Sequence, residues 1–397
     1  MKRINFVLFL VIVLFSACKT GSGELSVADF NFNGPLGSDG AQIEKLGTNH
    51  FRVTLSHAPG NSGWSNMLQF EIIKNAKGNS LQLDVVFSGG PMYSFNDYFY
   101  SWSYDGVNWQ PIHWESGKKD SIVEDSLIFP EFEEDKVYVG HQVPMSHSDV
   151  EKMIGEWAKS PFVTVHTIAQ SLGNRNIYRL EITDTKSKES GEIRWGHYFS
   201  NQHPGEHNAQ WRMVGMIDWL LSEEGEVCRK NSISHFILMS SPDGPSNGWY
   251  RVSARGVDMN RSYRSAGSDP DEQVHEAYLC QKDLEELMAS PYPVTDIWSM
   301  HTWQGIVEPI LEPGPEMGTM VEGWETLRDI IIANDEDNLI KPLKTREQSG
   351  ENTWTGGPHR QFGISAFLCE GAGSLYTKEE NIQTGIVLMK SLAQYYR

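Results

Sequence analysis

The stretch Gln202-His203-Pro204-Gly205-Glu206 brings two types of zinc ligand close together in the sequence. Imidazole nitrogen and carboxylate oxygen both bind Zn²⁺, and a two-residue gap within a turn lets both side chains reach one ion. Two further histidines, His197 and His207, lie close enough to be alternative ligands. His203 and His207 would share one face of a helix, but the Pro-Gly pair between them favours a turn. Spacing alone therefore makes His203 and Glu206 a candidate pair and no more.

A second stretch carries groups that suit a carboxylate ligand. Ser241-Pro242-Asp243-Gly244 is followed by Arg251 and then by Asn260-Arg261. Turn chemistry alone explains the Pro-Asp-Gly sequence. An adjacent amide and guanidinium can grip a carboxylate through several hydrogen bonds, which makes Asn260 and Arg261 candidate binding residues. On spacing alone, a surface loop with an exposed arginine is the favoured alternative.

Two more candidates stand at the ends of apolar segments. His301 ends the apolar run that begins at Asp296, and Glu370 ends the run that begins at Gly363. Strand ends are where α/β domains place ligands and catalytic groups. A histidine satisfied within the core is the ordinary alternative for His301. A glutamate delivered by a buried strand either caps a neighbour or acts as a general base.

The elements that must position these residues alternate between strand and helix after residue 163. Residues 164–168, 177–182 and 193–200 have the composition of strands. Three amphipathic helices are predicted, over residues 206–221, 271–289 and 378–396. This alternation predicts an α/β catalytic domain over residues 163–397, with a mixed central sheet and flanking helices.

Residues 26–162 have a different pattern, which predicts an antiparallel β-sandwich domain. Short β-rich runs at 50–55, 81–87 and 136–139 are separated by Gly, Asn, Asp and Pro clusters. Residues 104–109 have the turn chemistry of a hairpin. Within 146–160, apolar residues recur at helical spacing, so a linking helix is expected there.

The first residues have the pattern of a targeting segment. A positive start at Lys2 and Arg3 precedes an apolar run from Ile4 to Phe15, which is short of the about 18 residues needed to span a bilayer. Small residues before Cys18 resemble a bacterial lipobox. Residues 1–18 are thus expected to be a lipoprotein signal peptide with Cys18 lipidated, and residues 19–25 a linker. This predicts an extracytoplasmic, membrane-anchored bacterial lipoprotein; an ordinary cleaved signal with an incidental cysteine is the alternative.

Charge and cysteine content exclude several other classes. The formal net charge of −19 repels nucleic acids and anionic membrane surfaces, so neither is an expected partner. Beyond Cys18, the cysteines Cys228, Cys280 and Cys369 show no CxxC spacing, which argues against a cysteine zinc site. They are expected to be small buried hydrophobic residues, although a Cys228–Cys280 disulfide is possible.

Taken in order, the candidate stretches resemble the zinc carboxypeptidase superfamily that includes carboxypeptidase A, in particular its cytosolic carboxypeptidase-like branch. His-Pro-Gly-Glu, Pro-Asp-Gly, the later Arg, Gly-x-Asp-x-Asn-Arg, Ser-x-His-Thr and Phe-x-x-Glu occur in the family's order from about residue 163 onwards. The resemblance implies one Zn²⁺ ion held by three ligands: His203, Glu206 and His301. It also implies that Glu370 is the general base, that Arg251 stabilises the oxyanion, and that Asn260 and Arg261 hold the terminal carboxylate of a peptide.

The chain departs from the family pattern in two places. Ser241 replaces the family's Asn, and the mobile tyrosine that precedes the catalytic Glu has no counterpart, since Tyr376 lies on the wrong side of Glu370. Arg360 and His359 are candidates for the specificity pocket or for solvated loop positions. The leading hypothesis is a metallocarboxypeptidase acting on peptides. A zinc amidase or deacylase acting on a non-peptide amide, and a catalytically weak lipid-anchored binding protein, are the alternatives.

Overall fold

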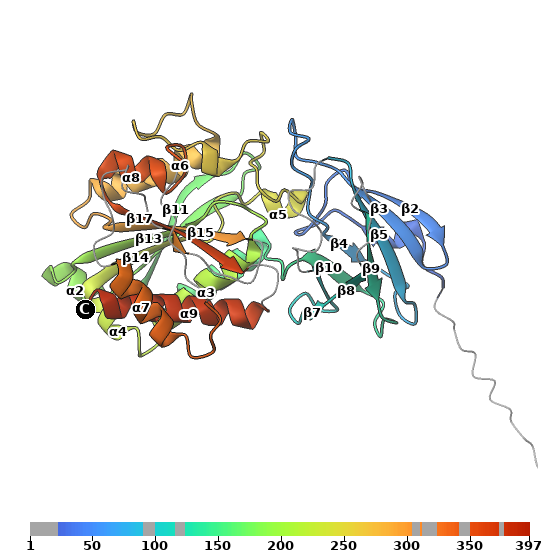
Figure 1. The fold of residues 1–397 in the computed structure, drawn as a ribbon, viewed down its shortest axis with the longest axis horizontal. Helices are drawn as coiled ribbons and strands as arrows, with labels where there is room; N and C mark the ends of the chain where they lie inside the picture. Colours follow the sequence, from blue (N-terminus) through green and yellow to red (C-terminus); the bar gives the residue numbers. More distant parts are fainter. Residues whose placement is uncertain are drawn as a thin grey trace, which may run out of the picture.

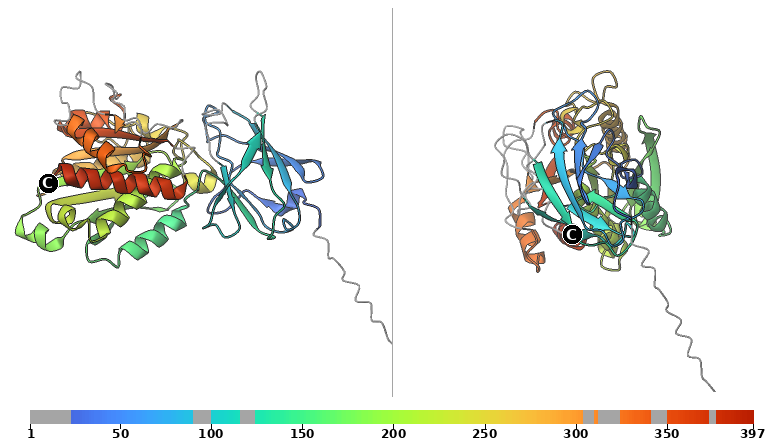
Figure 2. Two further views of the ribbon diagram at one scale, coloured as in Figure 1. Left: turned by 60° about the horizontal axis from the view of Figure 1, so that its bottom comes forward. Right: turned by 90° about the vertical axis from the view of Figure 1, so that its right-hand side faces the viewer.

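The structure, a computed structural model, describes residues 23–89, 100–115, 124–303, 310–311, 324–340, 350–372 and 377–397. Two parts lie side by side in Figures 1 and 2, a smaller one built of strands and a larger one with helices around a sheet. Cys18, the expected lipidation site, and Tyr376 fall outside the described residues.

The smaller part is a β-sandwich of two five-stranded sheets, ordered β1-β4-β10-β6-β7 and β2-β3-β5-β9-β8. Its strands are β1 (Phe30–Asn31), β2 (Gln42–Gly47), β3 (His50–Leu55), β4 (Phe70–Ile72), β5 (Leu81–Phe87), β6 (Tyr100–Ser103), β7 (Gln110–Pro111), β8 (His113–Glu115), β9 (Glu124–Phe129) and β10 (Val137–His141), after a 3₁₀ turn at Val27–Asp29. Pairing is antiparallel except between β3 and β5. Alternating side chains from both sheets, such as Phe51, Val53 and Leu83, fill the core between them. The predicted β-sandwich is therefore present.

The hairpin expected at residues 104–109 connects β6 to β7. The Asp105 carboxylate accepts hydrogen bonds from the backbone N–H groups of Val107 and Asn108, each at 2.8 Å. Gly106 has a φ of 72°, a value that residues with a side chain rarely adopt. The turn is therefore fixed by its own sequence.

Helix α1 (His147–Trp157) lies where the linking helix was predicted. Ser146 and Asp149 form a reciprocal capping box at its start. Its apolar residues Val150, Ile154 and Trp157 pack into the core cluster of the larger part. By packing, α1 thus belongs with the α/β part.

The larger part is built around a seven-stranded mixed sheet in the order β11-β12-β14-β13-β15-β17-β16. Its strands are β11 (Val163–Gln170), β12 (Asn176–Ile182), β13 (Trp195–Asn201), β14 (Ser232–Ile237), β15 (Asp296–Trp303), β16 (Ile310–Leu311) and β17 (Ser365–Ala372). The central strands β14, β13, β15 and β17 are parallel, and the outer ones are antiparallel. The parallel centre is buried on both faces, as its apolar strands require.

Helices cover both faces of this sheet, giving three layers (Figure 1). Helices α3 (His207–Leu221), α7 (Trp324–Asn334) and α9 (Lys378–Tyr395) lie on one face, and α6 (His275–Met288) and α8 (Gly356–Phe362) on the other. Shorter helices are α2 (Thr185–Ser190), α4 (Glu226–Asn231), α5 (Gly244–Asn247) and a 3₁₀ turn at Met259–Arg261. The predicted α/β architecture is confirmed.

The helix predicted from residue 271 begins only at His275. The Gln273 amide donates to the Ser262 carbonyl at 2.9 Å, and the Val274 N–H donates to the Ser262 hydroxyl, also at 2.9 Å. These tertiary bonds tie residues before His275 to the 3₁₀ turn, so the helix cannot extend back to Asp271.

The cysteines and the helices bear on two further expectations. The thiols of Cys228, Cys280 and Cys369 are buried and form no disulfide, so these residues are small core residues and no Cys228–Cys280 bridge is present. Among the described residues, no helix combines the length and the apolar character needed to cross a membrane.

Candidate metal centre and active site

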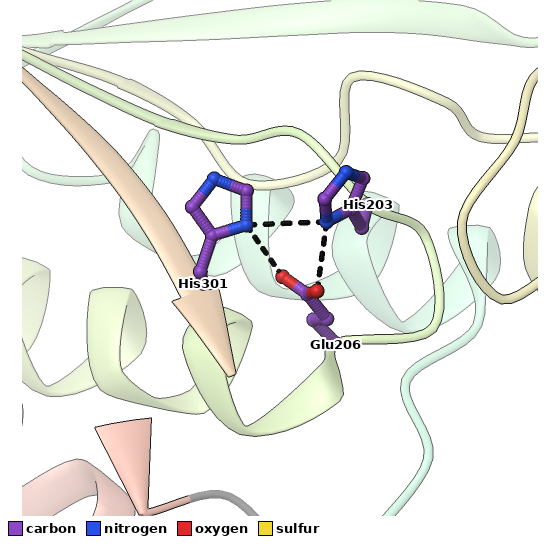
Figure 3. A group of neighbouring side chains, drawn as sticks. All are labelled: His203, Glu206 and His301. Carbon is purple, nitrogen blue, oxygen red and sulfur yellow. Dashed lines mark hydrogen bonds and ion pairs between the residues drawn. The ribbon is translucent and has the colours of Figure 1, made fainter. Parts of the chain in front are cut away.

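His203, Glu206 and His301 meet at the carboxyl end of the parallel strands. His203 and Glu206 lie in the turn between β13 and α3, and His301 lies near the end of β15. Parallel strands bring their carboxyl ends to one edge of the sheet, so the turn after β13 reaches the end of neighbouring β15. Each of the three side chains is about 2% exposed. In Figure 3 they converge on one point from three directions.

The three side chains present their ligand atoms to one another. His203 Nδ1 lies 2.7 Å from Glu206 Oε1, and His301 Nδ1 lies 2.8 Å from Glu206 Oε2. The two Nδ1 atoms are 3.2 Å apart. A tetrahedral zinc with bonds of about 2.0–2.1 Å sets neighbouring nitrogens roughly 3.3 Å apart. Among the described residues, this is the group of His, Cys, Asp and Glu side chains close enough to hold an ion.

The far nitrogen of each imidazole faces an oxygen. His203 Nε2 lies 3.0 Å from Asp258 Oδ1, and His301 Nε2 lies 2.8 Å from the Ser299 hydroxyl. A carboxylate can only accept, so Asp258 fixes the proton of His203 on Nε2 and leaves a lone pair on Nδ1. The Nδ1 lone pair of His203 therefore points towards His301 Nδ1 and the Glu206 carboxylate. A cation between these three groups would be bound by all of them. The donor set therefore fits Zn²⁺.

The electrostatics lower the pKa of Glu206 and raise that of Glu370. Burial by itself would raise the pKa of Glu206, but the two facing imidazoles outweigh it and hold that pKa below its usual range. Burial raises the pKa of Glu370, and the neighbouring Glu206 carboxylate raises it further. His301 lowers this pKa, but its effect is smaller than that of burial. Two carboxyl groups in one site are thus given different affinities for a proton, which suits one as ligand and the other as acid or base.

Glu370 and Arg251 both stand beside the candidate ligands. Glu370 on β17 is the register partner of His301 on β15, and it is half-buried. Arg251 Nε donates to Asp258 Oδ2 at 2.6 Å, so one carboxylate holds both His203 and Arg251. Asp258 therefore couples the candidate metal ligand to the candidate oxyanion donor.

Asn260 reaches the site, whereas Arg261 lies exposed beside it. The Asn260 amide nitrogen is 3.2 Å from His301 Nε2, and its oxygen accepts the Trp354 backbone N–H at 2.8 Å. Arg261 Nη1 donates to the Asn260 carbonyl at 2.7 Å. These contacts bring the pair to the site's edge, and its role as a carboxylate clamp stays a prediction.

The rival histidines lie outside this group. His197 Nδ1 pairs with Asp296 at 2.8 Å, and His207 faces Gln69 at 3.2 Å. His359 is buried with Nδ1 2.6 Å from the Ile364 carbonyl, while Arg360 is half-buried. Neither His197 nor His207 contributes a ligand atom to the group around Glu206, and a specificity-pocket role of His359 or Arg360 stays a prediction.

The β-sandwich contacts the site directly. Trp64 stacks beneath the Arg251 guanidinium, 5.3 Å from ring centroid to Cζ. A Cβ on Gly205 would come within 2.5 Å of the Tyr250 ring and 2.6 Å of the Met67 sulfur, so the turn between the ligands requires glycine. Sequence reasoning missed Trp64 and Met67, because nothing local marks a loop that docks on a distant segment.

The sequence did contain a signal for the partners of the two imidazoles. Asp258 is the Asp of the Gly-x-Asp-x-Asn-Arg stretch, and Ser299 stands two residues before His301. A carboxylate or hydroxyl partner for each ligating imidazole is a general expectation of metal sites. Applying it to the motif would have found both residues.

Residues 152–288 match a family model described as zinc carboxypeptidase. Cytosolic carboxypeptidase 2 of Xenopus tropicalis is 32% identical over 149 residues, which is 34% of this chain and 15% of that protein. The Danio rerio protein of the same name is 32% identical over 148 residues, covering 35% of this chain and 20% of its own length. Residues 152–288 are therefore similar to a zinc carboxypeptidase domain and to cytosolic carboxypeptidases, while the chain spans only a small part of those relatives.

Solved structures share the fold over both parts of the chain. The metallo-carboxypeptidase of Burkholderia cenocepacia superposes with a TM-score of 0.75 at 14% identity, covering 92% of this chain and 97% of that one. The metallo-carboxypeptidase of Pseudomonas aeruginosa, in complex with (2-guanidinoethylmercapto)succinic acid, gives 0.71 at 19% identity and covers 93% and 99%. The combination of a β-sandwich and an α/β domain is thus a known architecture.

Proposed function

We propose that this protein is a zinc metallocarboxypeptidase that removes C-terminal residues from peptides. The observation that carries the proposal is the convergence of His203 Nδ1, His301 Nδ1 and the Glu206 carboxylate on one buried point. Three protein ligands with one open position are typical of catalytic zinc. Zinc bound there supplies a nucleophilic water at neutral pH and polarises the scissile carbonyl.

The remaining residues act on the substrate and on protons. Glu370 accepts the proton of the attacking water and delivers it to the leaving amine, a role supported by its place beside His301. Arg251 stabilises the developing oxyanion, oriented by Asp258. Asn260 and Arg261 hold the terminal carboxylate, which directs attack to the last peptide bond. Leaving-group assistance by a tyrosine is not part of this proposal.

The test is peptide hydrolysis by the purified protein with its zinc content measured, beside Glu370→Gln. The expected result is stepwise C-terminal release, with kcat reduced at least about 100-fold in Glu370→Gln at unchanged zinc content. Release of an acyl group from non-peptide amides, with peptides untouched, would instead identify an amidase. Bound zinc without hydrolysis of any amide would leave a binding protein and contradict both enzymatic readings.

We also propose that the protein is an extracytoplasmic lipoprotein anchored through Cys18. The support is the leader pattern alone: a basic start, an apolar run and small residues before the cysteine. Labelled palmitate fed to the expressing bacterium is expected to enter the protein, and Cys18→Ala should abolish incorporation. Equal labelling of both proteins, or of neither, would contradict the anchor.

A further inference from the structure

Helix α3 begins on a candidate metal ligand that cannot cap it. Glu206 is the N-cap residue of α3, a position where a side-chain oxygen normally accepts a first-turn backbone N–H. Its carboxylate makes no such bond. Both of its oxygens face elsewhere, Oε1 towards His203 and Oε2 towards His301 and the Thr302 N–H. The Ala209 N–H donates to the Glu206 backbone carbonyl at 3.1 Å, but side-chain caps for the first turn of α3 must come from other elements.

Two other side chains supply these acceptors. Gln142 Oε1 accepts the Asn208 N–H at 3.1 Å, and the Thr302 hydroxyl accepts the Ala209 N–H at 3.1 Å. Thr302 follows His301 directly, so that cap comes from the metal site's own strand. Gln142 instead directly follows β10 of the sandwich, more than sixty residues before the helix it caps.

The backbone at Gln142 is built for this contact. Its side chain is 1% exposed, and its φ of 56° lies in the left-handed region, uncommon for a residue with a side chain. The Ser101 hydroxyl donates to its carbonyl oxygen, which holds the chain in that turn. A neighbouring contact strengthens the junction, because the Met145 N–H donates to His207 Nδ1 at 3.3 Å in the first turn of α3.

We propose that Gln142 is a positioning residue for the metal site. By capping α3 from the junction between the two parts, it leaves the Glu206 carboxylate free to bind the ion. Without this acceptor, the buried Asn208 N–H would lose its hydrogen bond to the Gln142 side chain. The first turn would then fray, or Glu206 would turn back to cap its own helix, and either change displaces a ligand oxygen. The inference rests on the proposed metal site and gives the sandwich a part in its geometry.

The test is zinc affinity, measured on metal-free protein by competition with a chromophoric chelator. Gln142→Met keeps the side-chain length and removes the acceptor, and it is expected to weaken zinc binding about 10-fold. Gln142→Glu keeps an acceptor at the same place, next to a helix N-terminus that favours negative charge, and should bind zinc as wild type does. Should Gln142→Met not fold, Gln142→Gly relieves the backbone and carries the same expectation.

Asn75→Leu is the matched control, with thermal unfolding of each metal-free variant measured alongside. Asn75 also has a left-handed φ, 62°, and its amide donates to Asp29 within the sandwich at 3.0 Å. It should lose stability without losing zinc affinity. Wild-type affinity in Gln142→Met, or equal losses in the Met and Glu variants, would overturn the inference. A wild-type protein that binds no zinc would refute the proposed metal site itself, a distinct outcome.

Discussion

Replacing Asp258 by Asn is predicted to weaken both the metal site and catalysis. The carboxylate accepts three hydrogen bonds, from His203 Nε2 at 3.0 Å, Arg251 Nε at 2.6 Å and the Asn260 N–H at 2.8 Å. An amide of the same shape offers one oxygen and one NH₂ group. The NH₂ group must then face either the imidazole N–H or the guanidinium, both of which are donors.

The size of the effect follows from the bond that is lost. A hydrogen bond to a charged group contributes about 1.5–3 kcal/mol, which corresponds to roughly 10- to 150-fold in an equilibrium constant or a rate. If the amide oxygen keeps its hydrogen bond to His203, the hydrogen bond to Arg251 is lost and kcat falls. If it turns to Arg251, the imidazole loses its orienting partner and zinc affinity falls about 10- to 100-fold.

The assay pairs chelator competition for zinc with kcat and KM on a peptide that the wild type cleaves. Asp269→Asn is the matched control, because Asp269 pairs with Arg264 at 3.0 Å in a separate, partly exposed ion pair. It is expected to leave zinc affinity and kcat unchanged. If Asp258→Asn matched the wild type in zinc affinity and in kcat, the coupling of His203 to Arg251 through one carboxylate would be refuted.

Three further predictions concern the sandwich contact, the ligand turn and acid stability. Trp64→Leu removes a cation–π contact of about 0.5–2 kcal/mol, so kcat/KM should fall roughly 2- to 30-fold and recover largely in Trp64→Phe; equal losses would refute a ring contact with Arg251. Gly205→Ala adds a Cβ where there is no room, so zinc content after dialysis should drop; full occupancy would contradict the tight turn. Burial alone would raise the pKa of Glu181, but pairs with neighbouring basic groups, Lys188 among them, lower it to about 2 from an unfolded value near 4.5. Its contribution to stability is therefore complete above pH 4.5 and lost as pH falls towards 2. Glu181→Gln should lower the free energy of unfolding by up to about 3 kcal/mol at pH 7 and progressively less below pH 4.5; a constant difference in urea unfolding across that range would contradict this.

Much of the fold is predictable because each element satisfies local rules. Strand β5 coincides with the predicted run at 81–87, and the α9 helix begins at the predicted Lys378, where Thr377 caps it. Helices α7 and α8 were missed. Helix α8 contains a Gly-Gly-Pro start, and its glycines pack closely against backbone at Gly350 and Glu351, a tertiary reason that propensity cannot supply.

The site shows the same distinction between residues that local sequence identifies and residues that only tertiary contacts bring in. His203, Glu206 and His301 were identifiable from residue type and strand-end position once the order of motifs was recognised, although spacing alone left His197 and His207 as rivals. In the structure, His197 pairs with Asp296 and His207 contacts Gln69, and both partners are distant in sequence. The residues that orient the site, Gln142 and Trp64 among them, come from segments whose docking only the folded chain reveals.

The central claim is that one zinc ion sits between His203, Glu206 and His301. The most direct test is a crystal of the zinc-loaded protein with anomalous data collected on both sides of the zinc absorption edge. The account predicts a single zinc peak about 2.0–2.1 Å from Nδ1 of both histidines and about 2.0–2.2 Å from a Glu206 oxygen. A peak at His207 or another site, or no peak at these three side chains, would contradict it.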